Sequence, residues 1–242
     1  MGTAYDGGMR SRPADELRPI RFTRQFTNTT PGSVLIEVGE TRVLCTASVE
    51  GDVPRWMRGS NKGWVTAEYA MLPGSSNDRI RRDSYQGGRA KEISRLIGRS
   101  LRSVVSMDRM GEAMVRVDCD VIQADGGTRT AAITGAWVAM HDAMAAGLDA
   151  GIIAEMPIID RVAATSVGIV GGLPLLDLEY ESDVAAEVDM NVVMTGRGLL
   201  VEVQGTAEGA PFSRDELGNL LDLASSGIDE LLDAQSQLTG MG

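Results

Sequence analysis

The chain has 242 residues, of which 43% are hydrophobic, and a formal net charge of -11 at pH 7. This length allows one large or two small domains, and the apolar content is enough for a proper core. No apolar run is long enough to span a bilayer, and residues 1–12 are polar and glycine-rich, unlike a secretion signal. We therefore exclude a membrane protein and expect a globular protein of the cytoplasm.

Chemistry based on histidine or cysteine is also limited. Cys45 and Cys119 lie in apolar alternating runs without a CxxC neighbour, which favours buried core thiols over a zinc site or a disulfide framework. His141 is the only histidine, which argues against metal sites and catalytic triads that need clustered histidines. Any activity must therefore use other side chains.

Positive charge is concentrated in the middle of the chain. Residues 79–109 contain nine basic and three acidic side chains, so the remainder of the chain is strongly acidic. A basic segment on an acidic body suits an extended polyanion, because each Lys or Arg that meets a phosphate releases condensed counterions. The alternative is a solvated helix face whose charges are satisfied by ion pairs.

The first half of the chain has the pattern of β-strands with two helices. Alternation of β-branched and apolar residues predicts a hairpin and two further strands, over residues 33–38, 41–49, 63–71 and 114–121. Apolar residues recur at helical spacing across residues 88–105, beside a face that carries arginines, which predicts an amphipathic helix. Residues 128–144 are mostly apolar and predict a helix that is buried on much of its circumference.

The second half repeats this order of strands followed by a helix. A hairpin is predicted around Gly171-Gly172, followed by an alternating strand over residues 184–195 and a strand at 199–205 that pairs back on it. Ser213 and Glu216 have the spacing of a capping box and begin a long C-terminal helix. The two halves predict a mixed α/β (α+β) fold in which strand-and-helix units are repeated.

A double glycine joins the strand at 114–121 to the helix at 128–144. Gly126 and Gly127 permit a sharp turn that exposes backbone N–H groups, and the first turn of a helix leaves such donors without intrahelical partners. Thr128 and Arg129 add a hydroxyl and a guanidinium where the helix dipole is positive, which suits phosphate. The alternative is a simple strand-to-helix corner with Thr128 as its cap.

Acidic residues gather at the start of the strand at 184–195. Asp183 and Asp189, with Glu187 between them, are predicted to converge on one side of this strand. In a site that binds phosphates, such carboxylates either hold Mg²⁺ or protonate a departing sugar oxygen. The alternative is a solvent-facing strand edge without a chemical role.

Seven ordered sequence blocks resemble the ribonuclease PH family of exoribonucleases, and the resemblance spans about residues 10–242. The blocks follow one another at matching spacing, which is far more specific than a lone glycine motif. They lie at residues 15–19, 32–35, 63–69, 92–99, 118–130, 186–191 and 203–206.

The resemblance implies a phosphate-dependent 3′-to-5′ exoribonuclease. Such an enzyme trims the 3′ ends of tRNA precursors, and possibly rRNA, and releases nucleoside diphosphates by a reversible nucleotidyl transfer. It also implies a ribosomal protein S5 domain 2-like fold with two layers of sheet and helix, assembled as a hexameric ring of dimers. The expected organisation is a variable arm at 1–9 and one domain at 10–242, with a core at about 10–145 and a C-terminal part at about 160–240.

The resemblance also assigns residues to roles. It implies that the co-substrate, inorganic phosphate, is bound by Arg89, Gly127, Thr128 and Arg129. It also implies that Asp183 and Asp189 are the catalytic carboxylates and the ligands of Mg²⁺. The residues expected to contact RNA are arginines of the basic segment, namely Arg79, Arg81, Arg82, Arg95 and Arg99.

The chain departs from the family pattern in three places. The connector at 80–88 is shorter than usual, Ala90 replaces a customary threonine, and Asp6-Gly7-Gly8 stands where the family has Asp-Gly-Arg. Two other functions stay open at this point. One is a non-catalytic, RNA-binding ring subunit of an exosome-like assembly, and the other is a hydrolytic nuclease that releases monophosphates.

Overall fold

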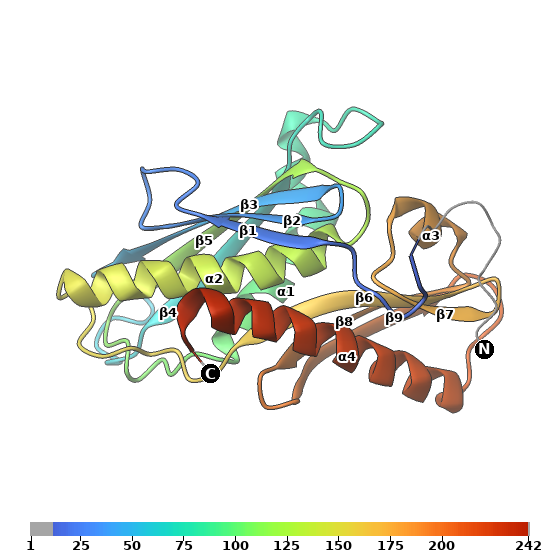
Figure 1. Cartoon of the computed structure of the whole chain (residues 1–242). Coiled ribbons are helices and arrows are strands. Elements are labelled where there is room, and N and C mark those ends of the chain that lie inside the picture. Colours follow the sequence, from blue (N-terminus) through green and yellow to red (C-terminus); the bar gives the residue numbers. More distant parts are fainter. Residues whose placement is uncertain (1–11, 242) are drawn as a thin grey trace.

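The computed structural model describes residues 12–241, which form two β-sheets and their helices (Figure 1). The first sheet has the strand order β1-β2-β3-β5-β4. Its strands are β1 Ile20–Arg24, β2 Gly32–Val38, β3 Thr41–Glu50, β4 Trp64–Met71 and β5 Met114–Gln123. Helix α1, Gly88–Arg102, connects β4 to β5, which pair in parallel, while the other neighbouring strands are antiparallel.

Helix α2, Thr128–Asp149, lies at the centre of the molecule. It packs against β2 and β3 of the first sheet and against β6, Val162–Val170, of the second. Every residue from Thr130 to Met140 is buried. A helix covered on both sides has no polar face, so its apolar residues surround the axis. The predicted buried helix is confirmed, and it extends five residues beyond Met144.

The second sheet has the antiparallel order β7-β6-β8-β9. Its remaining strands are β7 Leu173–Leu176, β8 Val188–Thr195 and β9 Leu200–Ala207. Helix α4, Arg214–Thr239, packs along β6, β7 and β8 (Figure 1). The predicted capping box is confirmed, because the Glu216 N–H donates to Ser213 Oγ and the Ser213 N–H donates to the Glu216 carboxylate.

Several local predictions were incomplete or wrong. Strand β1 and a 3₁₀ turn, η1 at Arg82–Gln86, were not predicted. The strand expected from residue 184 starts only at Val188, because Tyr180–Ala185 forms the short helix α3. Val184 and Ala185 are exposed on this helix, so their apolar character imitated the alternation of a strand without any burial.

The two cysteines confirm the core interpretation. Cys45 of β3 and Cys119 of β5 lie opposite each other in the sheet register, and both are buried thiols that form no disulfide. Within residues 12–241 no helix has the length and apolar character needed to cross a membrane. The arm expected at residues 1–9 lies outside the described residues, and the division into a core and a C-terminal part stays a prediction.

Candidate phosphate and RNA site

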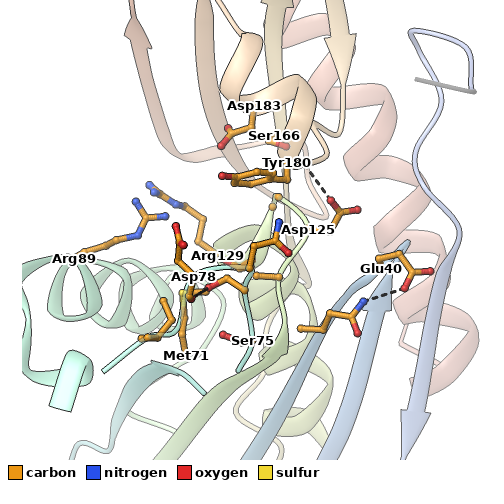
Figure 2. Close-up of a pocket in the computed structure, with 18 of the residues that line it drawn as sticks. Glu40, Met71, Ser75, Asp78, Arg89, Asp125, Arg129, Ser166, Tyr180 and Asp183 are labelled. Atoms are coloured by element: carbon orange, nitrogen blue, oxygen red, sulfur yellow. Dashed lines mark hydrogen bonds between the residues drawn. The ribbon is translucent and has the colours of Figure 1, made fainter. Parts of the chain in front are cut away.

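A cavity of about 840 Å³ opens where the two halves of the fold meet. Its walls come from the glycine turn before α2, the start of α1, helix α3 and strand β8 (Figure 2). Six of the residues predicted to act on phosphate or in catalysis line it: Arg89, Gly127, Thr128, Arg129, Asp183 and Asp189. The fold therefore brings together side chains that are up to 100 positions apart in the sequence.

The glycine turn has the backbone that the sequence predicted. Gly126 and Gly127 have φ angles of +72° and +64°, in the left-handed region that favours glycine. A Cβ atom on Gly126 would lie 2.4 Å from the carbonyl oxygen of Leu178, so this turn also packs closely against the second half. Gly127 occupies the N-cap position and no side chain caps the helix, so the alternative in which Thr128 is the cap is wrong.

Thr128 instead points its hydroxyl toward a buried tyrosine. Thr128 Oγ1 and the Tyr69 hydroxyl are 2.9 Å apart and share a hydrogen bond. Tyr69 is only 3% exposed, and burial raises the pKa of its phenol. The neutral phenol is therefore a fixed partner that holds the Thr128 side chain at the wall of the cavity.

The two cavity arginines come from separate helix starts. Arg89 is the second residue of α1, and Arg129 is the second residue of α2. Figure 2 shows both side chains extending into the cavity. Two guanidinium groups at the positive ends of two helices can hold one polyanion with several charge-assisted hydrogen bonds.

Sequence reasoning missed the residues that orient Arg129. Its Nη1 donates to Gln204 Oε1 of β9 at 2.8 Å, and Gln204 Nε2 donates to Glu92 Oε1 of α1, also at 2.8 Å. This chain of hydrogen bonds ties the two arginine-bearing helices to the second sheet. Gln204 and Glu92 both lie in family-like sequence blocks, which was the available signal, but their pairing depends on the fold.

The two cavity carboxylates come from neighbouring elements. Asp183 lies on α3 and Asp189 lies on β8. Burial raises the pKa of Asp189 to about 6, the negative charge of Asp183 adds to this, and Arg129 and Arg89 oppose it. Burial also raises the pKa of Asp183, again against the two arginines. Both carboxylates are therefore within the electrostatic reach of both arginines.

This donor set is compatible with Mg²⁺. The described residues contain no cluster of three or more His, Cys, Asp or Glu side chains that could hold a metal ion. Mg²⁺ usually binds through one or two carboxylates, several waters and substrate phosphates, not in an all-protein cage. Asp183 and Asp189, which both line the cavity and whose negative charges repel each other, are the pair that would hold it.

The arginines predicted to contact RNA are exposed but do not line the cavity. Arg79, Arg81 and Arg82 lie in the loop after β4 and in η1, and the same loop contributes Asn77, Asp78 and Ile80 to the cavity wall. Two of the five side chains have ion-pair partners. Arg81 pairs with Asp83 at 2.9 Å and Arg99 pairs with Glu202 at 2.6 Å, while Arg95 lies on the exposed side of α1.

Comparison with protein families places this chain in a known class. Residues 16–146 match domain 1 of the 3′ exoribonuclease family, and residues 160–227 match domain 2 of the same family. The chain therefore belongs to the 3′ exoribonuclease family.

Two curated relatives show which member of the 3′ exoribonuclease family the chain resembles in sequence. The chain is 57% identical over 228 residues to a ribonuclease PH of Neisseria meningitidis, covering 93% of this chain and 94% of the relative. It is 56% identical over 225 residues to a ribonuclease PH of Neisseria gonorrhoeae, covering 92% and 93%. The predicted resemblance to ribonuclease PH, and with it a phosphorolytic 3′-to-5′ exoribonuclease, is confirmed.

Solved structures share the fold at much lower identity. An Archaeoglobus fulgidus exosome chain, from a complex with RNA bound to the active site, superposes with a TM-score of 0.78 at 19% identity over 92% of this chain and 90% of that one. Rice (Oryza sativa) Rrp46 gives a TM-score of 0.75 at 18% identity over 96% and 99%. These similarities support the predicted S5 domain 2-like architecture.

Proposed function

We propose that the cavity is the phosphorolytic centre, in which Arg89, Gly127, Thr128 and Arg129 hold the attacking phosphate and Asp183 and Asp189 act at the RNA 3′ end. The observation that carries this proposal is the convergence of two arginines from separate helix starts with two carboxylates in one cavity. Attacker and target are both anions, so their approach depends on fixed positive charge.

In the proposed reaction, an oxygen of inorganic phosphate attacks the phosphorus of the last phosphodiester. The bond from this phosphorus to the O3′ of the preceding nucleotide breaks, and the terminal nucleotide leaves as a nucleoside diphosphate. O3′ then needs a proton. Asp189 can supply it, because the raised pKa of about 6 leaves part of this carboxyl protonated near neutral pH.

We also propose Mg²⁺ at Asp183 and Asp189. When bound there, the ion would neutralise negative charge between the carboxylates and the phosphates. Two carboxylates that line the same cavity support this proposal, because their negative charges repel each other and a cation between them would relieve that repulsion. Phosphorolysis should fall after chelation and return with added Mg²⁺. Full activity after complete chelation would remove the ion from the proposal and leave only the proton-transfer role.

We assign the RNA substrate to the 3′ end of tRNA precursors, with possible extension to rRNA. Backbone contacts are proposed for Arg79, Arg81, Arg82, Arg95 and Arg99. Their exposure, and the presence of neighbouring loop residues in the cavity wall, support contact with RNA that leaves the cavity. The sequence resemblance, not the geometry, supports tRNA in particular.

For the assembly we propose a homohexameric ring of dimers in the cytoplasm. Exposed apolar side chains in and beside the edge strand β9, namely Leu199, Leu200 and Val203, support burial against another subunit. The two free thiols suit the reducing cytoplasm. Light scattering should give six times the 25.7 kDa chain mass. A monomeric mass at working concentration would contradict the ring.

One assay separates the three activities considered. A tRNA with extra 3′ nucleotides is incubated with and without inorganic phosphate, and the products are resolved by chromatography. Nucleoside diphosphates that appear only with phosphate support phosphorolysis. Monophosphates that appear without phosphate would indicate hydrolysis, and RNA binding without any product would indicate a non-catalytic ring subunit.

A further inference from the structure

A buried ion pair lies behind the phosphate turn and outside the cavity lining. Arg18 is 5% exposed and Asp177 is 3% exposed, and neither residue lines the cavity. Arg18 Nε and Nη2 donate to Asp177 Oδ2 and Oδ1 at 2.9 and 2.7 Å, and the Arg18 N–H donates to Oδ2 at 2.8 Å. This pair joins the segment before β1 to the turn after β7.

The same arginine holds the backbone of the phosphate turn. Arg18 Nη1 donates to the carbonyl oxygen of Asp125, and Nη2 lies 3.4 Å from that of Gly126. Thr41 Oγ1 donates to the Gly126 oxygen at 2.7 Å and accepts from the Asp125 N–H at 2.9 Å. Both carbonyl groups of the turn are therefore fixed on its buried side.

The hydrogen bonds to these two carbonyl groups determine which way the next two N–H groups point. In a trans peptide the C=O and the N–H lie in one plane and point in opposite directions. When Arg18 and Thr41 hold the Asp125 and Gly126 oxygens inside, the N–H groups of Gly126 and Gly127 turn outward. Successive N–H groups that face one side before a helix start form an anion-binding concavity.

The ion pair between Arg18 and Asp177 also positions the segment that carries Asp183. Asp177 has a φ of +55°, which is uncommon for a residue other than glycine, and its N–H donates to the Ser166 oxygen at 2.7 Å. Three residues later α3 begins, and this helix bears Asp183. The Tyr180 N–H in turn lies 3.3 Å from Asp125 Oδ1 of the phosphate turn.

We propose that Arg18 and Asp177 are positioning residues of the reaction, which fix the N–H groups of the phosphate turn and the approach of the Asp183 segment without touching substrate. The inference rests on the phosphate site proposed above. A purely structural ion pair would affect unfolding and assembly but would leave the affinity for phosphate unchanged.

The test compares two matched arginines. Arg24 makes a similar bidentate pair with Asp142, at 2.9 and 2.6 Å, near the other end of α2. Arg18→Lys keeps the charge but loses the fork, so we expect the KM for phosphate to rise about tenfold or more while the KM for RNA changes less. Arg24→Lys should leave both values near those of the unchanged protein.

Two further variants cover the cases in which Arg18→Lys fails to fold or the phosphate site itself is wrong. Thr41→Val removes only the hydroxyl, and we expect the KM for phosphate to rise by roughly threefold or more. It decides the question if Arg18→Lys fails to fold or assemble. An unchanged KM for phosphate in an assembled Arg18→Lys or, failing that, Thr41→Val protein would overturn the inference. Arg129→Ala tests the phosphate site itself, and no effect there would refute that site instead.

Discussion

Arg129 is the cavity arginine whose orientation is most fully determined, because Gln204 holds its guanidinium from β9. Loss of a charge-assisted contact to phosphate costs about 1.5–3 kcal/mol, so Arg129→Ala should raise the KM for phosphate roughly ten- to hundredfold. Steady-state kinetics at limiting phosphate measures this. Lys91→Ala, which removes a cation from α1 outside the cavity lining, should have little effect.

Asp189 should matter for turnover more than for binding. Asp189→Asn keeps the shape of the side chain but removes the titrating carboxyl, and we expect kcat to fall about 10²- to 10⁴-fold. Filter binding of RNA should change little. Glu187→Gln alters the exposed acid two positions earlier, which does not line the cavity. An equal loss of kcat in that variant would show that general charge, not position, is responsible.

Individual site residues were predictable where a local pattern or a family block marked them. The left-handed glycines and Arg129 follow from the sequence around residues 126–129, whereas Arg89 was assigned by the family resemblance. Gln204 and Arg18 could not be assigned roles this way, because their partners Arg129 and Asp177 are 75 and 159 positions away. Such long-range hydrogen bonds exist only after the two halves have packed.

At the level of elements, helix α2 depends on close approach to the sheet. A Cβ atom on Gly135 would lie 2.6 Å from Ile36 Cγ2 and 2.9 Å from Cys45 Sγ, whereas one on Gly218 of α4 would meet nothing within 4 Å. Both substitutions to alanine gain about 1 kcal/mol of helix propensity. Gly135→Ala also overpacks the core at about 1–3 kcal/mol.

Thermal unfolding of the two variants should therefore differ in sign. Gly218→Ala should raise the midpoint, and Gly135→Ala should lower it. A higher midpoint for Gly135→Ala would mean that β2 and β3 can move away from α2 without cost, and the tightly packed centre described above would be wrong.

The long elements and the short hairpin strand β7 were predicted, whereas β1 and α3 were not. The strands β2 to β6, the long helices and the capping box carry strong periodicity or paired signals. Strand β1 has only five residues, partly exposed, and α3 has six. Neither element is long enough for its apolar pattern to distinguish a strand from a helix. For this reason Asp183 was predicted to lie beside a strand, whereas it lies on a helix.

For the whole molecule, the uneven charge predicts how salt affects RNA binding. Each cation that neutralises a phosphate of single-stranded RNA adds about 0.7 to the slope of log affinity against log salt. Arg82→Gln should therefore weaken RNA binding and reduce this slope by about that amount. Arg116→Gln changes an arginine paired with Glu50 on the first sheet and is the control. Equal slopes in both variants would argue against RNA contact at Arg82.

The ion pair between the two halves should also make stability depend on pH. The Asp177 carboxyl is buried, which alone would raise its pKa, but hydrogen bonds and charge from Arg18, with Arg12 nearby, hold the pKa below its usual range. Such a group stabilises the fold above its unfolded pKa of about 3.9, and this contribution is lost as the pH falls through the folded pKa.

Asp177→Asn should thus be less stable than the unchanged protein at pH 7, and the difference should shrink below about pH 4. Urea unfolding across this pH range measures it. A difference that stays constant with pH would show that the charge of Asp177 is not what joins the halves.

The central position of α2 also sets the rates at which its amide hydrogens exchange with solvent. Its middle is covered by both sheets, so those amides can exchange only when the halves separate. Its first residues, Thr128 and Arg129, line the cavity. Their N–H groups have no intrahelical acceptor, so these amides exchange from the folded protein until an anion occupies them. Phosphate should therefore slow a few amides at one end of the slowest-exchanging helix, and hydrogen exchange would record binding there without any turnover.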